Sequence, residues 1–202
     1  MTDATEITSK KRKVAWGITG GGDRLRETVE VMKEINREYG EVVNVEVYLS
    51  KAGEQVVRYY ELTDDLKQNF RRVTVEINAN SPFLAGWLQT KKYEFLLIAP
   101  ATSNTVAKIS MGIGDTLLSN AAIMALKGRV TVYVMPTDYR EGTIHTILPD
   151  NQGAVLKVRK EDIDNVRKLE GIENVFVLEK PEDIGGVFSK HFARLNSALE
   201  KD

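Results

Sequence analysis

The chain of 202 residues is 42% hydrophobic and 28% charged, and its 28 basic residues nearly balance 29 acidic ones. This is the composition of a globular protein with its own core, without the basic surplus expected of a nucleic-acid-binding protein or a polybasic membrane anchor. Because there is no cysteine and there are only two histidines, disulfides, cysteine nucleophiles and cysteine-ligated clusters are excluded, and we expect no metal site.

The amino-terminal residues 1–12 are mostly polar and end in a basic run, so we expect a solvated arm ahead of the first strand. No apolar run reaches the roughly 18 to 20 residues that a membrane-spanning helix needs. The start also lacks the apolar core of a signal peptide. We therefore expect a cytoplasmic protein with no membrane partner.

Strand-like and helix-like segments alternate along the rest of the chain. Apolar or alternating runs predict strands at 14–18, 43–49, 73–77, 95–99, 130–135 and 175–178. Helical spacing of apolar residues predicts helices at 23–38, 52–62 with a possible continuation at 64–70, 82–88, 104–126 and 181–199. Segments 143–148 and 154–158 flank a Pro-Asp-Asn-Gln-Gly turn and are typical of a hairpin. The pattern predicts an α/β fold, a Rossmann-like three-layer sandwich with a mostly parallel sheet, plus a carboxy-terminal β-hairpin and helix.

In such a fold, ligands bind at the carboxyl ends of the strands, near the switch point in strand order. The first turn contains Gly17, Thr19, Gly20 and Gly21. Glycines let the backbone approach a phosphate, the following helix presents N–H groups there, and Thr19 adds a hydroxyl. The spacing is neither G-x-G-x-x-G nor a P-loop, and a flexible strand-to-helix turn is an equally good interpretation of this loop alone.

Polar residues also follow two later strands. Ser50 comes after the second strand, in the position of a helix cap or a phosphate donor. Four consecutive side chains after the strand at 95–99 can form hydrogen bonds: Thr102, Ser103, Asn104 and Thr105. Capping a helix needs one or two of them. Four indicate a polar ligand with several acceptors, such as a phosphate or the edge of a flavin ring.

The run from Pro100 to Thr105, continuing through Lys108, Gly112 and Gly114, resembles the PASANT motif of the FMN-binding flavoproteins. That superfamily includes phosphopantothenoylcysteine decarboxylase, the lantibiotic peptidyl-cysteine decarboxylases and the flavin prenyltransferases. The first turn is similar to its G-x-T-G-S/G phosphate loop, and Ser50 falls where the group has Ser or Thr. The resemblance covers roughly residues 13 to 140. It implies an FMN site with Gly17, Thr19, Gly20, Gly21 and Ser50 at the phosphate end, and Ala101, Thr102, Ser103, Asn104, Thr105, Met135 and Pro136 toward the ribityl chain and ring.

The remainder is similar to a narrower subgroup, the archaeoflavoproteins and dihydromethanopterin reductases. Its signature here is a hairpin extension at 141–160 and the stretch that follows, to Leu169. This resemblance implies one flavoprotein domain over 1–202 and electron transfer from ferredoxin or a similar donor to a small-molecule acceptor such as a pterin. It also implies a homo-oligomer. The apolar excess from Ile113 to Leu126 agrees, because it exceeds what one helix face needs and predicts partial burial between subunits.

The sequence departs from the motifs of the cysteine decarboxylases at two places, which narrows the range of activities that the resemblance implies. The cysteine decarboxylases have a histidine near the position of Gly86 and a P-x-M-N motif where this chain has Pro136-Thr137-Asp138, so decarboxylation of a cysteinyl substrate is disfavoured. No catalytic residue is assigned, because FMN itself supplies redox chemistry. Two alternatives stay open. One is a flavin prenyltransferase-like transferase, which would need a prenyl-phosphate pocket built from cations such as Lys108, Arg129 and Arg140. The other is a non-catalytic FMN-binding module.

Overall fold

A computed structural model describes residues 11–147 and 152–199, and its centre is a six-stranded sheet in the order β3-β2-β1-β4-β5-β8. All five neighbouring pairs are parallel. The strands are β1 (Arg12–Ile18), β2 (Val43–Leu49), β3 (Arg72–Val75), β4 (Phe95–Ala101), β5 (Thr131–Pro136) and β8 (Val175–Val177). The chain runs outward from β1 to β3 and then returns to the other side of β1. The switch point therefore lies between β1 and β4.

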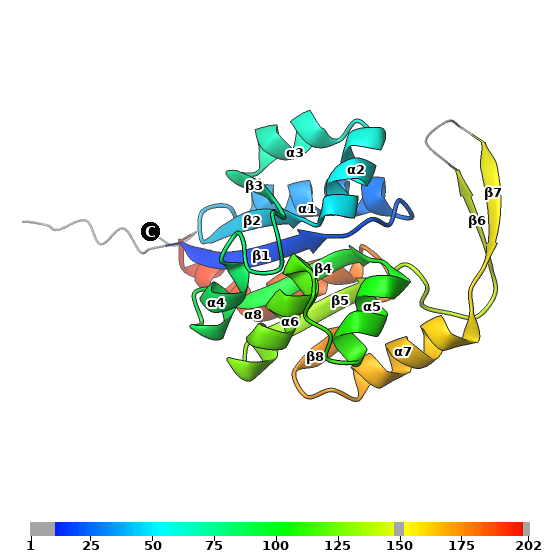
Figure 1. Cartoon of the computed structure of the whole chain (residues 1–202). Helices are drawn as coiled ribbons and strands as arrows, with labels where there is room; N and C mark the ends of the chain where they lie inside the picture. The colour runs from blue at the N-terminus through cyan, green and yellow to red at the C-terminus, as the bar shows by residue number, and fades with distance from the viewer. Residues whose placement is uncertain (1–10, 148–151, 200–202) are drawn as a thin grey trace, which may run out of the picture.

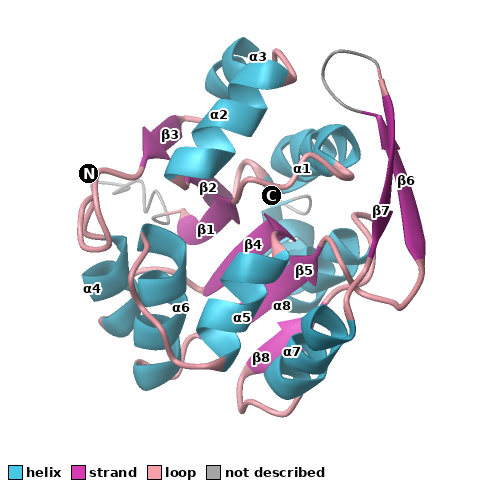
Figure 2. Ribbon diagram, turned by 45° about the vertical axis from the view of Figure 1, so that its right-hand side comes forward, coloured by secondary structure: helices cyan, strands magenta, loops and turns pink. Residues whose placement is uncertain are grey.

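Helices cover both faces of this sheet (Figures 1 and 2). One face packs against α1 (Leu25–Tyr39), α2 (Lys51–Tyr59), α3 (Thr63–Asn69) and α8 (Asp183–Leu199). The other packs against α4 (Leu84–Gln89), α5 (Ser103–Ser110), α6 (Leu117–Lys127) and α7 (Lys160–Glu170). The predicted three-layer α/β sandwich is confirmed.

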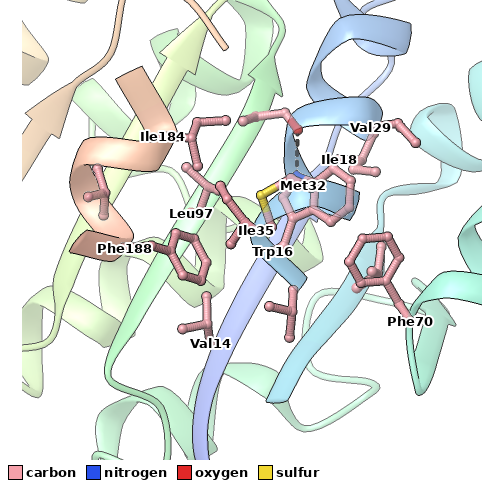
Figure 3. Close-up of a cluster of buried hydrophobic side chains, with 14 of the residues drawn as sticks. Val14, Trp16, Ile18, Val29, Met32, Ile35, Phe70, Leu97, Ile184 and Phe188 are labelled. Atoms are coloured by element: carbon pink, nitrogen blue, oxygen red, sulfur yellow. Dashed lines mark hydrogen bonds between the residues drawn. The ribbon is translucent and has the colours of Figure 1, made fainter. Parts of the chain in front are cut away.

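The continuous apolar runs of the central strands produce these layers. Along β1, Val14, Trp16 and Ile18 enter one buried cluster, and Ala15 enters the other. Side chains of a strand alternate between faces, so an unbroken apolar run buries both. Figure 3 shows the first cluster, where Trp16 lies between Met32 of α1 and Phe70. Its ring meets Phe70 edge-on, with 5.3 Å between centroids.

The predicted hairpin is also confirmed. β6 (Thr143–Ile147) and β7 (Gly153–Lys157) pair antiparallel and stand apart from the sheet, beyond the carboxyl end of β1 (Figure 1). The proline-containing turn between them lies outside the described residues, apart from Gln152 and Gly153. Val155 and Leu156 of β7 are 65% and 54% exposed, so the hairpin has apolar side chains that no described part of the chain covers.

Several boundaries differ from those predicted. β1 begins at Arg12, the last residue of the expected arm, because its N–H donates to the Val42 carbonyl (2.8 Å); residues 1–10 lie outside the described range. The helix expected over 104–126 is two helices, since the chain turns at Gly112, whose φ is 73°. A left-handed Glu61 likewise separates α3 from α2. Across the described residues, no helix has the length and apolar character to span a membrane.

His191 of α8 gives the fold a pH dependence. Its Nε2 lies 3.0 Å from the Tyr133 hydroxyl, and its ring lies 4.8 Å from that of Phe95. Burial, aided by Lys190 and opposed by Glu94, lowers the pKa of His191. The His191 side chain therefore binds a proton more tightly in the unfolded chain than in the folded one. Its neutral ring contributes fully to the stability of the fold above the unfolded pKa of about 6.5, and this contribution is lost as the pH falls below that value. We expect urea unfolding to show a smaller loss of stability between pH 7.5 and 5.5 for His191→Gln than for the wild type. Identical losses would contradict this role.

Candidate functional site

The turns after β1 and β4 are tied together by Thr19. The N–H and hydroxyl of Thr19 both donate to the Pro100 carbonyl (3.2 and 2.9 Å), and the Thr102 N–H donates to the Thr19 hydroxyl (2.8 Å). Thr19 is only 2% exposed. The sequence predicts that the Thr19 hydroxyl contacts a phosphate. In the structure, this hydroxyl instead hydrogen-bonds the two loops to each other at the switch point.

The glycines that follow Thr19 bring backbone close to two other turns. A Cβ on Gly20 would lie 2.8 Å from the Ala52 Cβ of α2, and one on Gly21 would lie 2.6 Å from the Thr137 Cγ2 after β5. Within the described residues, no hydrogen bond uses the N–H groups of Gly20, Gly21 or Gly22. Backbone donors are normally paired, and successive free N–H groups in a turn form an anion-binding concavity. This loop is therefore a candidate phosphate cradle.

Two helices begin at the same edge of the sheet. The Ser50 hydroxyl accepts a hydrogen bond from the Gly53 N–H (2.9 Å) and caps α2, and the Thr102 hydroxyl accepts one from the Thr105 N–H (3.4 Å) and caps α5. Helix amino termini carry partial positive charge, so both favour an anion nearby. The Asn104 side chain is exposed and makes no hydrogen bond to the residues that the structure describes, so it is free to meet a ligand.

Two acidic residues at this end of the strands were not among the predicted site residues. Asp138, after β5, accepts hydrogen bonds from the hydroxyls of Ser103 and Thr137 and so joins two turns. Glu76, after β3, is buried and accepts from the N–H groups of Lys51 and Leu117, at the first turns of α2 and α6. Each is the first ionisable residue after its strand, which is the one sequence signal that would have singled them out.

Three predicted residues lie in the core. Gly17 is inside β1, where a Cβ would lie 2.7 Å from Leu118 Cδ2. The side chains of Ala101 and Met135 are buried in the two hydrophobic clusters. Only their backbones border the loops; the Ala101 carbonyl accepts from the Thr137 N–H (2.9 Å).

A cavity of about 370 Å³ adjoins these loops, between the turn after β1, the turn after β5 and the base of the hairpin. Pro136 lines it together with Asp23, Tyr139 and Ile144. Burial raises the pKa of Asp23; Arg24 opposes this, while Glu27 and Asp138 add to it. The surroundings of Asp23 thus favour its protonated form.

Comparison with known proteins gives a consistent picture. The profile of a family described as Flavoprotein matches residues 2–180. Two similar proteins come from Methanocaldococcus jannaschii. An uncharacterised one is 49% identical over 89% of this chain and 95% of its own length, and a dihydromethanopterin reductase (acceptor) is 33% identical over 85% and 94%. The crystal structure of Burkholderia xenovorans DmrB in complex with FMN, described as a cubic protein cage for redox transfer, superposes with a TM-score of 0.77 at 28% identity, covering 93% of this chain and 99% of that one.

Proposed function

This chain belongs to the Flavoprotein family, as its motifs predicted, and we propose that it is an FMN-dependent redox protein with the cofactor held at the switch point between β1 and β4. The observation that carries the proposal is the run of three backbone N–H groups, at Gly20, Gly21 and Gly22, that pair with no described residue. They lie beside the amino termini of α2 and α5, as the Gly20–Ala52 and Thr19–Thr102 contacts show. That donor set fits a phosphate monoester dianion.

The remaining predicted residues divide the site by chemistry. Ser50 and the first turn of α2 would extend the phosphate end, and Ser103, Asn104 and Thr105 would hold the polar ribityl chain and ring edge. Pro136 borders the adjoining cavity. When bound, FMN supplies one- and two-electron transfer, so the protein's part is to bind it, orient it and set its surroundings.

We further propose that electrons come from ferredoxin or a similar donor and pass to a small-molecule acceptor such as a pterin. The relative named dihydromethanopterin reductase supports this acceptor class. The cavity of about 370 Å³ supports it as well, because Tyr139 offers an aromatic surface for a flat ring and Asp23 a carboxyl that can hydrogen-bond to its nitrogens.

A homo-oligomer is the third part of the proposal. The exposed Val155 and Leu156 lie on a two-stranded hairpin, a unit that is marginally stable without packing partners, and the similar DmrB is described as a cage. The apolar excess of α6 adds no support, since Leu117, Leu118 and Ala121 are buried against the chain's own sheet and α4.

The prenyltransferase alternative receives less support from the cations it requires. Lys108 is paired with Asp115 (2.9 Å) and Arg140 with Glu179 (2.7 Å). Arg129 precedes β5 and so lies at the amino end of the strands, away from the cradle.

The test is the visible spectrum of the purified protein under anaerobic conditions. We expect yellow protein whose flavin bands bleach on adding reduced ferredoxin and recover on adding a dihydropterin. A spectrum that ignores ferredoxin but responds to dimethylallyl phosphate would replace the redox proposal with the prenyltransferase. Colourless protein that takes up no added FMN would refute both.

A further inference from the structure

A cavity of about 700 Å³ lies at the amino ends of the strands, opposite the end that carries the glycine loop. It is formed by the starts of β1 and β3, by Trp87 of α4 and by the residues between α4 and β4. Figure 1 places α4 on the side of the molecule away from the hairpin. β1 has seven residues at about 3.3 Å each, so roughly 20 Å separates the two sites and neither includes the other's residues.

This basic cavity concentrates positive charge in a chain whose net charge is −1. Six cationic side chains line it, against one carboxylate: Lys11, Arg12, Lys13, Arg72, Lys91 and Lys92, with Glu94. Glu94 is occupied by Arg12 (2.8 Å). The ammonium groups of Lys91 and Lys92 make no ion pair or hydrogen bond with any described residue. Two lysines are therefore available to an anion.

A buried carboxylate beneath the cavity fixes two of the other cations. Glu46 is 3% exposed, and its oxygens accept from Lys13 (2.7 Å), Arg72 (3.4 Å) and the hydroxyls of Tyr48 (3.0 Å) and Tyr93 (2.6 Å). Burial alone would raise the pKa of Glu46, but the hydrogen bonds from Lys13, Tyr93 and Tyr48 outweigh it and hold the pKa below its ordinary value. The wall is thus prearranged rather than a set of loose surface charges.

An aromatic surface completes the cavity. The partly exposed Trp87 lines it, and the Arg72 guanidinium lies over the indole, 5.1 Å from the ring centroid. A flat ring can pack against the indole and beside the guanidinium. Fixed cations, free lysines and an indole in one concave site match the parts of a molecule with phosphates at one end and an aromatic ring at the other.

We propose that the basic cavity binds a nucleotide, with its phosphates on Lys91 and Lys92 and its base against Trp87. Its volume falls within the roughly 300 to 1,000 Å³ typical of small-molecule sites. A cavity of this size favours a small ligand over a protein or nucleic-acid strand, which would need an extended surface. The site lies outside the FMN site proposed above and does not depend on it.

The test is titration of the FMN-loaded protein with ATP at low salt, without Mg²⁺, followed by calorimetry and tryptophan fluorescence. Of the two tryptophans, Trp16 is fully buried, so Trp87 is the reporter. We expect saturable quenching with FMN retained, and tighter binding of ATP than of pyrophosphate or adenosine. Lys91→Glu with Lys92→Glu should weaken ATP binding at least about tenfold, or about 1.4 kcal/mol. The matched control, Lys67→Glu with Lys180→Glu, makes the same charge change at exposed lysines outside the cavity and should bind normally.

Several outcomes would overturn the proposal. Absence of saturable ATP binding, or equal weakening in both double variants, would remove the site. Equal affinity for ATP and pyrophosphate would refute the role of Trp87. Release of FMN by ATP would place the nucleotide in the flavin site. Tighter binding of a single-stranded oligonucleotide would reassign the surface to nucleic acid.

Discussion

Gly20→Ala is expected to weaken FMN binding at least about tenfold, which corresponds to about 1.4 kcal/mol. The added Cβ would lie 2.8 Å from the Ala52 Cβ, a distance that side-chain rotation cannot relieve because alanine has no further torsion to turn. The loop or the start of α2 must shift instead. That shift moves the free N–H groups of Gly20, Gly21 and Gly22 away from the arrangement proposed to hold the phosphate. Equilibrium titration of the apoprotein with FMN measures the effect.

A rescue variant makes this test specific. Ala52→Gly removes the methyl that Gly20→Ala would strike, so the double variant should recover most of the lost affinity. Gly186→Ala is the matched control, because a Cβ there meets nothing within 4 Å. Normal FMN affinity in Gly20→Ala, or a loss that Ala52→Gly leaves unchanged, would show that the loop after β1 is not the cradle.

Of the substitutions considered, Trp16→Ala should destabilise the fold most, lowering the free energy of unfolding by about 3 to 5 kcal/mol. The side chain is 0% exposed and packs in the cluster shown in Figure 3. Its indole N–H also donates to the Ala99 carbonyl (2.8 Å). The β4–β5 register shifts between Ile98 and Ala101, so the indole satisfies a carbonyl at an interruption of the ladder. Substitution therefore leaves both a cavity and an unpaired buried acceptor.

Trp16→Phe separates these two terms, since it keeps an aromatic ring against Phe70 but removes the N–H. We expect a loss of about 1 to 3 kcal/mol for the unpaired carbonyl together with some packing loss. Urea unfolding followed by circular dichroism gives both values without relying on tryptophan emission. A loss below about 1 kcal/mol for Trp16→Ala would contradict the position assigned to this ring.

The layered architecture could be predicted because it depends on local pattern. The apolar run in β4 identifies a strand buried on both faces, and the polar run from Thr102 to Thr105 predicts that a ligand binds at the carboxyl end of that strand. The same run carries the family resemblance that the comparisons support. These signals lie within a few residues of one another, so they can be recognised without knowing the tertiary structure.

The roles of individual site residues required distances between segments far apart in sequence. Thr19 stands in a phosphate-loop motif, yet its hydroxyl is used by Pro100 and Thr102, more than 80 positions away. Met135 follows the pattern of a site residue, but its strand register turns the side chain into the core. Nothing local to Asp138 indicates that it joins the turns after β4 and β5.

The fold class could be derived from the sequence alone, because periodicity and turn chemistry are properties of short segments. The family followed from the resemblance of two loop motifs, and the end of the sheet at which a ligand binds stays a prediction. Which hydrogen-bond donors of the loops are already paired became clear from the tertiary structure, since their partners come from other strands and turns. It alone assembled the basic cavity, where Lys13, Arg72 and Lys91 come from three separate segments around Glu46 and Trp87. Charges distant in sequence form a site only where the crossover connections of a parallel sheet bring their strands side by side.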